Sequence, residues 1–255
     1  MAGKRDQPDT SALTNRIAAG SWRSLKSVGR REYKQKLMQL NKREEDARMH
    51  TIFESLIDNI VFTGDLKTDI FLFLSANQCS ETAEHCIDVG AESKRIALMY
   101  NADPQAAEVA GWLHDISAVF PNSERIEVAR ELHLEILPEE EQFPMIIHQK
   151  ISKVMAEEIF KITDQAILNA VGCHTTLKKN STIFDQVLFV ADKISWDQRG
   201  TPPYINELNR SLQQSITHGA FAYINYLWER KETLKVVHPW LSEAYEDLKG
   251  KVRIL

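Results

Sequence analysis

Apolar residues recur at helical spacing along most of the chain, and no stretch alternates apolar and polar positions as a strand does. The pattern predicts helices near residues 67–77, 80–100, 105–114, 123–133, 145–160, 164–174 and 184–194. A long helix is expected over 205–224, followed by a last helix from Pro239 to the residue before Gly250. The sequence therefore predicts an all-α fold.

Two segments are expected to interrupt or precede this series of helices. The acidic stretch LPEEEQFP, residues 137–144, is predicted to be a loop. Residues 30–60 fit a charged helix that leads into an apolar stripe around Phe53 and Leu56. We divide the chain into an N-terminal extension over 1–50, partly flexible, and a helical domain over 51–255.

The composition is that of a globular protein, and its charge is unevenly distributed. Of 255 residues, 43% are hydrophobic and 26% are charged, which excludes a largely disordered or fibrous chain. Residues 1–50 carry a net charge of +6, whereas the remainder carries −11. A basic arm can contact nucleic acid, but this one lacks interleaved aromatic residues and precedes an acidic body. We therefore favour a solvated extension and expect no nucleic-acid partner.

Cysteines and apolar runs indicate the cellular setting. The three cysteines form no CxxC pair, which argues against a disulfide framework and against a thiolate zinc site. The apolar runs are far shorter than the roughly 20 residues of a membrane span, and the N-terminus lacks the apolar core of a secretory signal. We expect a cytoplasmic protein without a membrane partner.

Histidines and aspartates in apolar helices are the candidate chemistry. A buried carboxylate is costly unless it is paired or bound to a cation. Each residue taken singly fits a satisfied core position, but the ordered set across five successive helices favours a metal site. The set is His85, His114, Asp115, His148, His174 and Asp192. The histidines at 50, 133, 218 and 238 lack this context and are expected to be surface or structural.

This set of donors limits the choice of metal. Imidazole and carboxylate ligands without thiolate suit Fe, Mn, Zn or Ni. Two metal ions about 3.5–4 Å apart can hold a phosphoryl group and activate a water. Cys86 and Cys173 adjoin two of the histidines, but one helical position turns a side chain about 100° away, so we expect both to serve packing.

Five segments resemble the HD-domain phosphohydrolases, and in particular the YqeK-type symmetrical diadenosine tetraphosphate hydrolases. They are EHCIDVGAESKRIALMY, AAEVAGWLHDIS, IIHQKI, ILNAVGCHTT and VLFVADKI. The resemblance covers roughly residues 66–200, with the core motifs in 80–200 and more divergent helices in 201–255. It implies an all-helical bundle around two divalent ions, with iron favoured over Mn, Zn, Ni or Mg.

The resemblance also implies a role for each residue of the set. His85, His114, Asp115 and Asp192 match the positions that bind the first metal of the superfamily. His148 and His174 match the second site, and Asp115 bridges the two ions. Asp115, His148 and His174 are the implied catalytic residues, and the implied reaction converts diadenosine tetraphosphate into two ADP.

Several substrate contacts of that family are replaced. Ala118 stands where the family usually has a lysine, and Thr82 where an arginine is common, so the substrate stays open. Lys193, Arg199 and Thr175 are our candidates for phosphate contacts, with surface charge or helix capping as the alternative. Trp196 and Tyr204 offer flat faces for a nucleobase, although packing explains them as well.

We expect a metal-dependent phosphohydrolase that acts on a nucleotide or another phosphate-containing small molecule. The alternative is a weakly active or inactive nucleotide-binding regulatory module. An RNA-associated enzyme with a basic arm is a weaker third reading. The apolar C-terminal helix fits either the core or a dimer surface, so a homodimer is left open.

Overall fold

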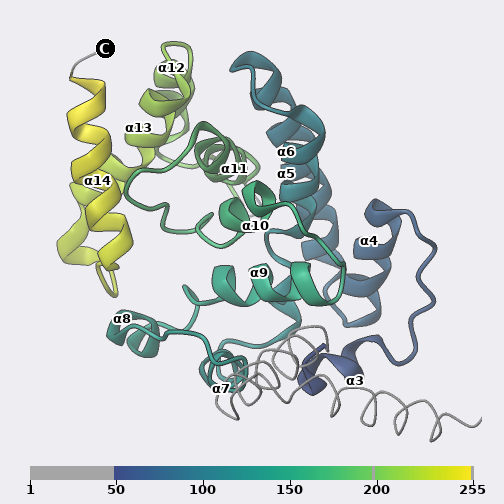
Figure 1. Ribbon diagram of the computed structural model, residues 1–255. Helices are drawn as coiled ribbons and strands as arrows, with labels where there is room; N and C mark the ends of the chain where they lie inside the picture. The colour runs from purple at the N-terminus through teal and green to yellow at the C-terminus, as the bar shows by residue number, and fades with distance from the viewer. Residues whose placement is uncertain (1–48, 197–198, 254–255) are drawn as a thin grey trace, which may run out of the picture. The chain divides into compact units, whose positions relative to one another are not determined.

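A computed structural model describes residues 49–196 and 199–253, so residues 1–48 of the extension predicted over 1–50 lie outside the described part. Every regular element of the described part is a helix, which confirms the all-α prediction (Figure 1). None of these helices combines the length and the apolar character that crossing a bilayer requires. The elements are η2 (Thr51–Phe53), α3 (Glu54–Ile57), α4 (Leu66–Ala76), α5 (Ser80–Met99), α6 (Pro104–Leu113), η3 (Ile116–Val119), α7 (Arg125–Glu131), α8 (Pro138–Gln142), α9 (His148–Glu158), α10 (Gln165–Val171), α11 (Ile183–Ile194), α12 (Ile205–Leu212), α13 (Ile216–Trp228), η4 (Lys231–Thr233) and α14 (Pro239–Val252).

Local capping explains where several helices begin. The Asp65 carboxylate accepts from the Thr68 backbone N–H at the start of α4, and Asp103 accepts from two backbone N–H groups at the start of α6. Thr182 and Asp185 form a reciprocal capping box at the start of α11. These signals are local in sequence, so the pattern alone locates the beginnings of these helices well.

Helix α11 lies in the middle of the domain, with α5 and α6 on one side and α12, α13 and α14 on the other (Figure 1). Its residues 185–191 are all buried, and the run VLFVA is fully apolar. Burial of this run stabilises the core through the removal of apolar surface from water. It also brings the end of α11, with Asp192, into the interior.

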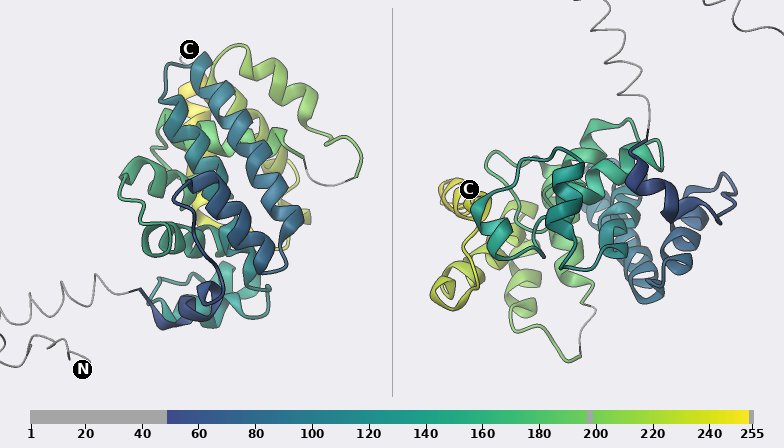
Figure 2. Two further views of the ribbon diagram at one scale, coloured as in Figure 1. Left: turned by 90° about the vertical axis from the view of Figure 1, so that its right-hand side faces the viewer. Right: turned by 90° about the horizontal axis from the view of Figure 1, so that it is seen from below.

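Helices α5 and α6 pack side by side at very short range (Figure 2). A Cβ atom at Gly111 would lie 2.5 Å from the Gly90 Cα atom, so a side chain at that position has no space. The two glycines therefore permit a close approach of the two backbones. This approach places His85 of α5 beside His114 at the end of α6, with ring centroids 5.1 Å apart.

The structure corrects the single helix expected over 205–224. Helix α12 ends at Leu212 and α13 begins at Ile216, because Ser215 is extended and its hydroxyl accepts from the His218 backbone N–H. A Cβ at Gly219 would lie 2.9 Å from Leu212 Cδ1, so the absence of a side chain there permits the tight corner.

Three other boundaries differ from the prediction. Helix α14 continues through Gly250 to Val252, with a 2.7 Å pair between Lys251 Nζ and Asp247 Oδ2 in its last turns. The acidic stretch contains the short helix α8, because Pro138 stands in its first turn and Glu140 reaches back to the Leu137 N–H. The described part of the expected helix over 30–60 forms only η2 and α3.

Candidate metal centre

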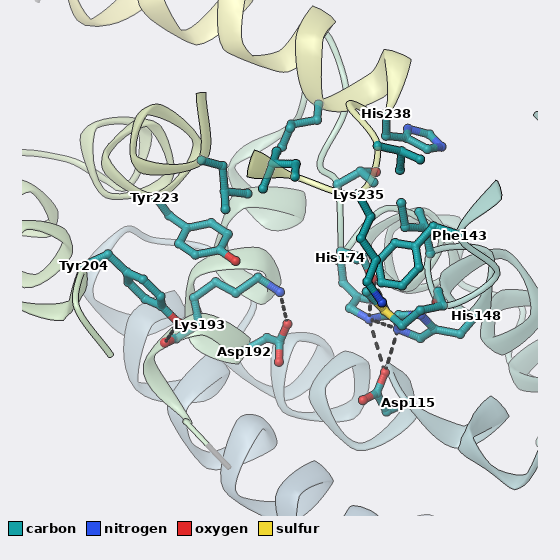
Figure 3. Close-up of a pocket in the computed structure, with 18 of the residues that line it drawn as sticks. Asp115, Phe143, His148, His174, Asp192, Lys193, Tyr204, Tyr223, Lys235 and His238 are labelled. Carbon is teal, nitrogen blue, oxygen red and sulfur yellow. Dashed lines mark hydrogen bonds and ion pairs between the residues drawn. The ribbon is translucent and has the colours of Figure 1, made fainter. Parts of the chain in front are cut away.

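Six side chains from five separate parts of the fold lie close together, and all of them except His114 line one cavity. Figure 3 labels Asp115, His148, His174 and Asp192 of this set. Helix α5 contributes His85, the end of α6 contributes His114 and Asp115, and α9 begins with His148. The turn after α10 contributes His174, and the last turn of α11 contributes Asp192. The structure thus brings together all six residues that the sequence selected as metal ligands.

The first group of donors surrounds Asp192. Its Oδ1 atom lies 3.4 Å from His85 Nε2 and 3.6 Å from His114 Nε2. Asp115 Oδ2 lies 3.6 Å from the same His114 nitrogen. Two imidazoles and two carboxylates therefore face a common point.

The second group of donors surrounds the other oxygen of Asp115. Its Oδ1 atom lies 3.0 Å from His148 Nε2 and 3.3 Å from His174 Nε2. Those two histidine nitrogens lie 2.9 Å from each other. Asp115 therefore presents one oxygen to each group, which is the position a bridging ligand requires.

Backbone carbonyls hold three of the histidines in one tautomer. The Nδ1 atom of each lies within hydrogen-bond distance of a carbonyl three residues earlier: His114 to Gly111 at 2.7 Å, His148 to Met145 at 2.5 Å and His174 to Val171 at 2.8 Å. A carbonyl only accepts, so Nδ1 carries the proton and donates. In the neutral ring, each Nε2 atom is then left with a lone pair directed into the site, as in histidines that ligate metals.

This arrangement of donors fits a divalent cation. Within the described residues, His114 Nε2 and Asp115 Oδ1 are buried without a hydrogen-bond partner. Three triplets of donor atoms, drawn from the same six residues, each lie within 4.8 Å of one another. Buried lone pairs that face other lone pairs are costly, and a cation relieves that cost.

The charges of the metal-free site are strongly coupled. Burial raises the pKa of Asp115, but the neighbouring His114 and His148 outweigh burial and hold this pKa well below its usual range. Burial likewise lowers the pKa of His114, yet Asp115 and the other neighbours raise it well above the ordinary value. For His174 burial prevails and lowers the pKa to about 4. Without metal, the site therefore keeps ionised carboxylates beside both a charged and a neutral imidazole.

The cavity has a volume of about 410 Å³ and extends from the metal ligands toward the C-terminal helices (Figure 3). Trp196, Tyr204 and Tyr223 also line it, and Figure 3 shows the two tyrosines on the side of Lys193. Two lysines line it, Lys193 from α11 and Lys235 from the segment before α14. The Lys193 ammonium group pairs with Asp192, and Lys235 Nζ lies 4.5 Å from the centre of the Phe143 ring.

The three residues predicted to contact phosphate lie in different surroundings. Lys193 and Thr175 line the cavity, and Thr175 Oγ1 lies 3.2 Å from His148 Nε2 and 3.1 Å from His174 Nε2. Arg199 is exposed in the loop after α11 and is not among the residues that line the cavity. Trp196 and Tyr204 both line the cavity and also pack on each other, with ring centroids 6.2 Å apart.

Sequence reasoning missed two residues of this cavity, Lys235 and His238. Lys235 stands in a short connection without a motif, and its place at the cavity depends on how α14 folds back. His238, which was expected to be surface or structural, is 2% exposed and caps the first turn of α14. The one local signal was Pro239, which follows His238 in the chain and favours the first turn of a helix.

The model of the HD-domain family matches residues 82–197. Over 146 residues the chain is 48% identical to an uncharacterised protein in the pepC 5′ region of Lactococcus lactis subsp. cremoris, covering 57% of this chain and 74% of that protein. The chain belongs to the HD-domain family. All six candidate ligands of this HD domain lie within the matched segment.

More distant relatives of this HD domain carry named activities. It is 28% identical over 169 residues to a symmetrical bis(5′-nucleosyl)-tetraphosphatase of Halalkalibacterium halodurans, covering 65% of this chain and 87% of that one. A Bacillus subtilis protein of the same name is 27% identical over 142 residues, covering 52% and 74%. A solved structure of a Clostridium acetobutylicum protein, described as a predicted HD superfamily hydrolase involved in NAD metabolism, superposes with a TM-score of 0.66 at 22% identity, over 75% of this chain and all of that one. This last likeness shows the shared fold.

Proposed function

We propose that this HD-domain protein is a metal-dependent phosphohydrolase that cleaves a phosphoanhydride or phosphoester bond of a nucleotide-like substrate. Diadenosine tetraphosphate, cleaved to two ADP, is the first candidate. The observation that carries the proposal is the shared position of Asp115, which lines the cavity and presents one oxygen to each group of donors. The names of the relatives at 27–28% identity support the choice of the first substrate.

The proposed metal ligands fall into two sets. His85, His114 and Asp192 hold the first ion, His148 and His174 hold the second, and Asp115 is shared. Divalent ions held there supply the Lewis acidity that hydrolysis of a phosphoryl group requires. Iron is favoured, and Mn, Zn, Ni and Mg compete for the same nitrogen and oxygen donors.

The protein itself supplies the contacts that orient the phosphate chain. Lys193 and Lys235 offer ammonium donors on either side of the cavity, and Thr175 offers a hydroxyl beside the metal ligands. Burial lowers the pKa of Lys193, but the neighbouring Asp192 prevails and raises it above its ordinary value. Lys193 therefore remains charged throughout the physiological range and stabilises negative charge near the end of the phosphate chain.

The aromatic wall suits a nucleobase. The Tyr204 and Tyr223 rings lie 4.6 Å apart, and Trp196 packs against Tyr204 in the same wall. Aromatic faces bind bases through stacking, and each face that lines the cavity offers such a surface. Lys193 Nζ lies 5.7 Å from the centre of the Tyr223 ring, so the base-binding and phosphate-binding regions adjoin each other.

The test is hydrolysis by the metal-loaded full-length protein. The substrates are diadenosine tetraphosphate, nucleoside di- and triphosphates and a simple phosphate ester, and the products are separated by chromatography. We expect Asp115→Asn to abolish turnover while the helical circular-dichroism spectrum is retained. Asp88→Asn, a change at an exposed residue of α5, is the matched control and should leave the rate unchanged. Full activity of pure Asp115→Asn would refute the proposal.

The second candidate is a nucleotide-binding regulatory module without turnover. Two observations favour it: Ala118 carries no charge, and Lys193, a cation that lines the cavity, already pairs with the carboxylate of Asp192. The same panel separates the candidates. Saturable nucleotide binding by metal-loaded protein, without phosphate release from any substrate, supports the module and excludes the enzyme.

A further inference from the structure

A second cavity has a volume of about 320 Å³. It shares no lining residue with the metal cavity, yet at three places residues one or two positions apart in the chain line the two cavities. His148, His174 and His238 line the metal cavity. Their near neighbours in the chain, Lys150, Cys173 and Trp240, line the second cavity. Two residues that line the second cavity, Lys150 and Cys173, therefore stand within two positions of a candidate metal ligand in the chain.

Lysines dominate the charge of this second cavity. Its lining includes Lys150, Lys153 and Lys178 and a single acidic residue, Glu135. Lys150 is almost fully buried, which is unusual for a lysine, whereas the other two are half-buried. Lys150 and Lys178 pair with Glu140 and Asp185, which stand outside the lining, so Lys153 is the lysine of this cavity left to attract an anion.

Hydrogen-bond donors remain available on these lysines. An ammonium group has three N–H donors. Lys150 Nζ uses two of them, on the Glu135 carbonyl at 2.9 Å and on Glu140 Oε2 at 2.8 Å. Lys178 Nζ pairs with Asp185 at 3.4 Å. Lys150 Nζ also lies 4.9 Å from the centre of the Trp240 ring, so the donor left for a ligand belongs to Lys178 rather than to Lys150, as far as the described contacts go.

Lys153 provides the clearest unneutralised charge. Its Nζ atom donates to Asn169 Oδ1 at 3.2 Å, a neutral acceptor, and no carboxylate pairs with it among the described residues. Because the Asn169 oxygen accepts this bond, its amide N–H groups are left as additional donors at the same wall. Ammonium and amide donors at one wall are the groups that bind the oxygens of phosphate.

We propose that this second cavity is a binding site for the phosphate group of a small molecule, separate from the metal centre. Lys153 and Lys178 bind the phosphate oxygens, and Lys150, fixed by Glu140, completes the wall. The apolar side chains of Leu134 and Val154 line the same cavity and accommodate an organic group attached to the phosphate. The proposal concerns binding alone and is independent of the hydrolytic reaction.

Tryptophan fluorescence distinguishes the two cavities, because Trp240 lines the second cavity and Trp196 lines the first. Metal-loaded full-length protein is titrated with inorganic phosphate, with AMP and with adenosine. Phosphate and AMP also bind at the proposed metal centre and change the Trp196 signal, so the second cavity is read in Trp196→Phe. We expect the response to persist in Trp196→Phe and to disappear when Trp240→Phe is added to it. Adenosine, which has no phosphate, should give no response from Trp240.

Lysine variants then test the contacts themselves. In Lys153→Gln/Lys178→Gln, the affinity reported by Trp240 should fall at least tenfold, whereas the response of Trp196 stays unchanged. Lys179→Gln, an exposed neighbour that does not line the cavity, is the matched control and should bind as the parent does. If the double variant unfolds, Lys153→Gln alone replaces it, because its partner Asn169 is neutral.

Three results would overturn the proposal. They are an unchanged affinity in a folded lysine variant, a phosphate response of Trp196→Phe that survives the additional change Trp240→Phe, and binding of adenosine to Trp196→Phe as tight as that of AMP. None of these measurements depends on turnover. Loss of hydrolysis in Asp115→Asn, or its absence in the parent protein, therefore decides the proposed function separately.

Discussion

The Nε2 atoms of His148 and His174 lie 2.9 Å apart, although backbone carbonyls hold the proton of each ring on Nδ1. Two unprotonated nitrogens cannot hydrogen-bond to each other, so a cation between them stabilises this pair. The adjoining Asp115 oxygen, 3.0 Å from His148 Nε2, adds negative charge to the same point. The geometry is that of a ligand set, which leads to the first prediction.

Metal binding is expected to release protons. The pKa of His114 is raised well above its ordinary value in the metal-free protein, so this imidazole is protonated at pH 7 and must lose its proton to ligate. Titration of metal-free protein with Mn²⁺ by calorimetry, in buffers of different ionisation enthalpy, measures this release. We expect a positive proton release at pH 7 and weaker binding as the pH falls. Identical heats in all buffers would contradict the assignment.

Acid is expected to destabilise the metal-free protein through His174. The folded-state pKa of His174 is about 4, below its ordinary value of 6.5, so the unfolded chain binds the additional proton between these values. The contribution is fully present above pH 6.5 and is lost as the pH falls to 4, by roughly 3 kcal/mol. Urea unfolding between pH 4 and 7 measures the slope. His174→Gln should flatten it, whereas an unchanged slope in that variant would assign the acid sensitivity to other groups.

Much of the candidate site was predictable because its signals are local. A histidine or aspartate inside an apolar helical run is recognisable without any knowledge of tertiary structure, as Asp192 in VLFVADKI illustrates. Helix beginnings at Asp65, Asp103 and Thr182 follow from caps that span three residues. The resemblance to a family then assigned these isolated signals to one centre.

The remaining features depend on contacts between distant segments. Apolar periodicity continues from Leu208 through Leu212 to Ile216, so it gave no sign of the break between α12 and α13. Lys235 lines the cavity only because α14 folds back beside α13. Within the acidic stretch, Glu140 looks like its solvent-exposed neighbours, yet it is fully buried against two partners from other segments.

Glu140 is predicted to be a major stabilising residue of the wall between the two cavities. It is fully buried and contacts Lys150 at 2.8 Å and His238 Nε2 at 3.3 Å. Burial raises its pKa, but hydrogen bonds from these two partners outweigh burial and lower it, so Glu140 is ionised. Glu140→Gln leaves the buried ammonium group without its counter-charge and should cost about 3–5 kcal/mol in the free energy of unfolding.

The control for this prediction is the adjacent glutamate of α8. Glu141 is more than half exposed and pairs with Arg130 at 3.1 Å on the surface, where such pairs contribute about 0–1 kcal/mol. Denaturant unfolding of the two variants under identical conditions makes the comparison. Equal stabilities of Glu140→Gln and Glu141→Gln would show that the buried pair contributes nothing to folding.

Lys235 is predicted to bind substrate rather than metal. It lines the metal cavity but belongs to none of the donor groups, and its ammonium group lies over the Phe143 ring. A charge-assisted hydrogen bond contributes about 1.5–3 kcal/mol, so Lys235→Gln should lower kcat/KM by about tenfold or more at unchanged metal content. Lys231→Gln is the matched control, because Lys231 packs over Trp228 and does not line the cavity. Steady-state rates with diadenosine tetraphosphate, and metal analysis of both variants, measure the effect. A parent-like kcat/KM in Lys235→Gln would leave Lys193 as the principal cation for the phosphate chain.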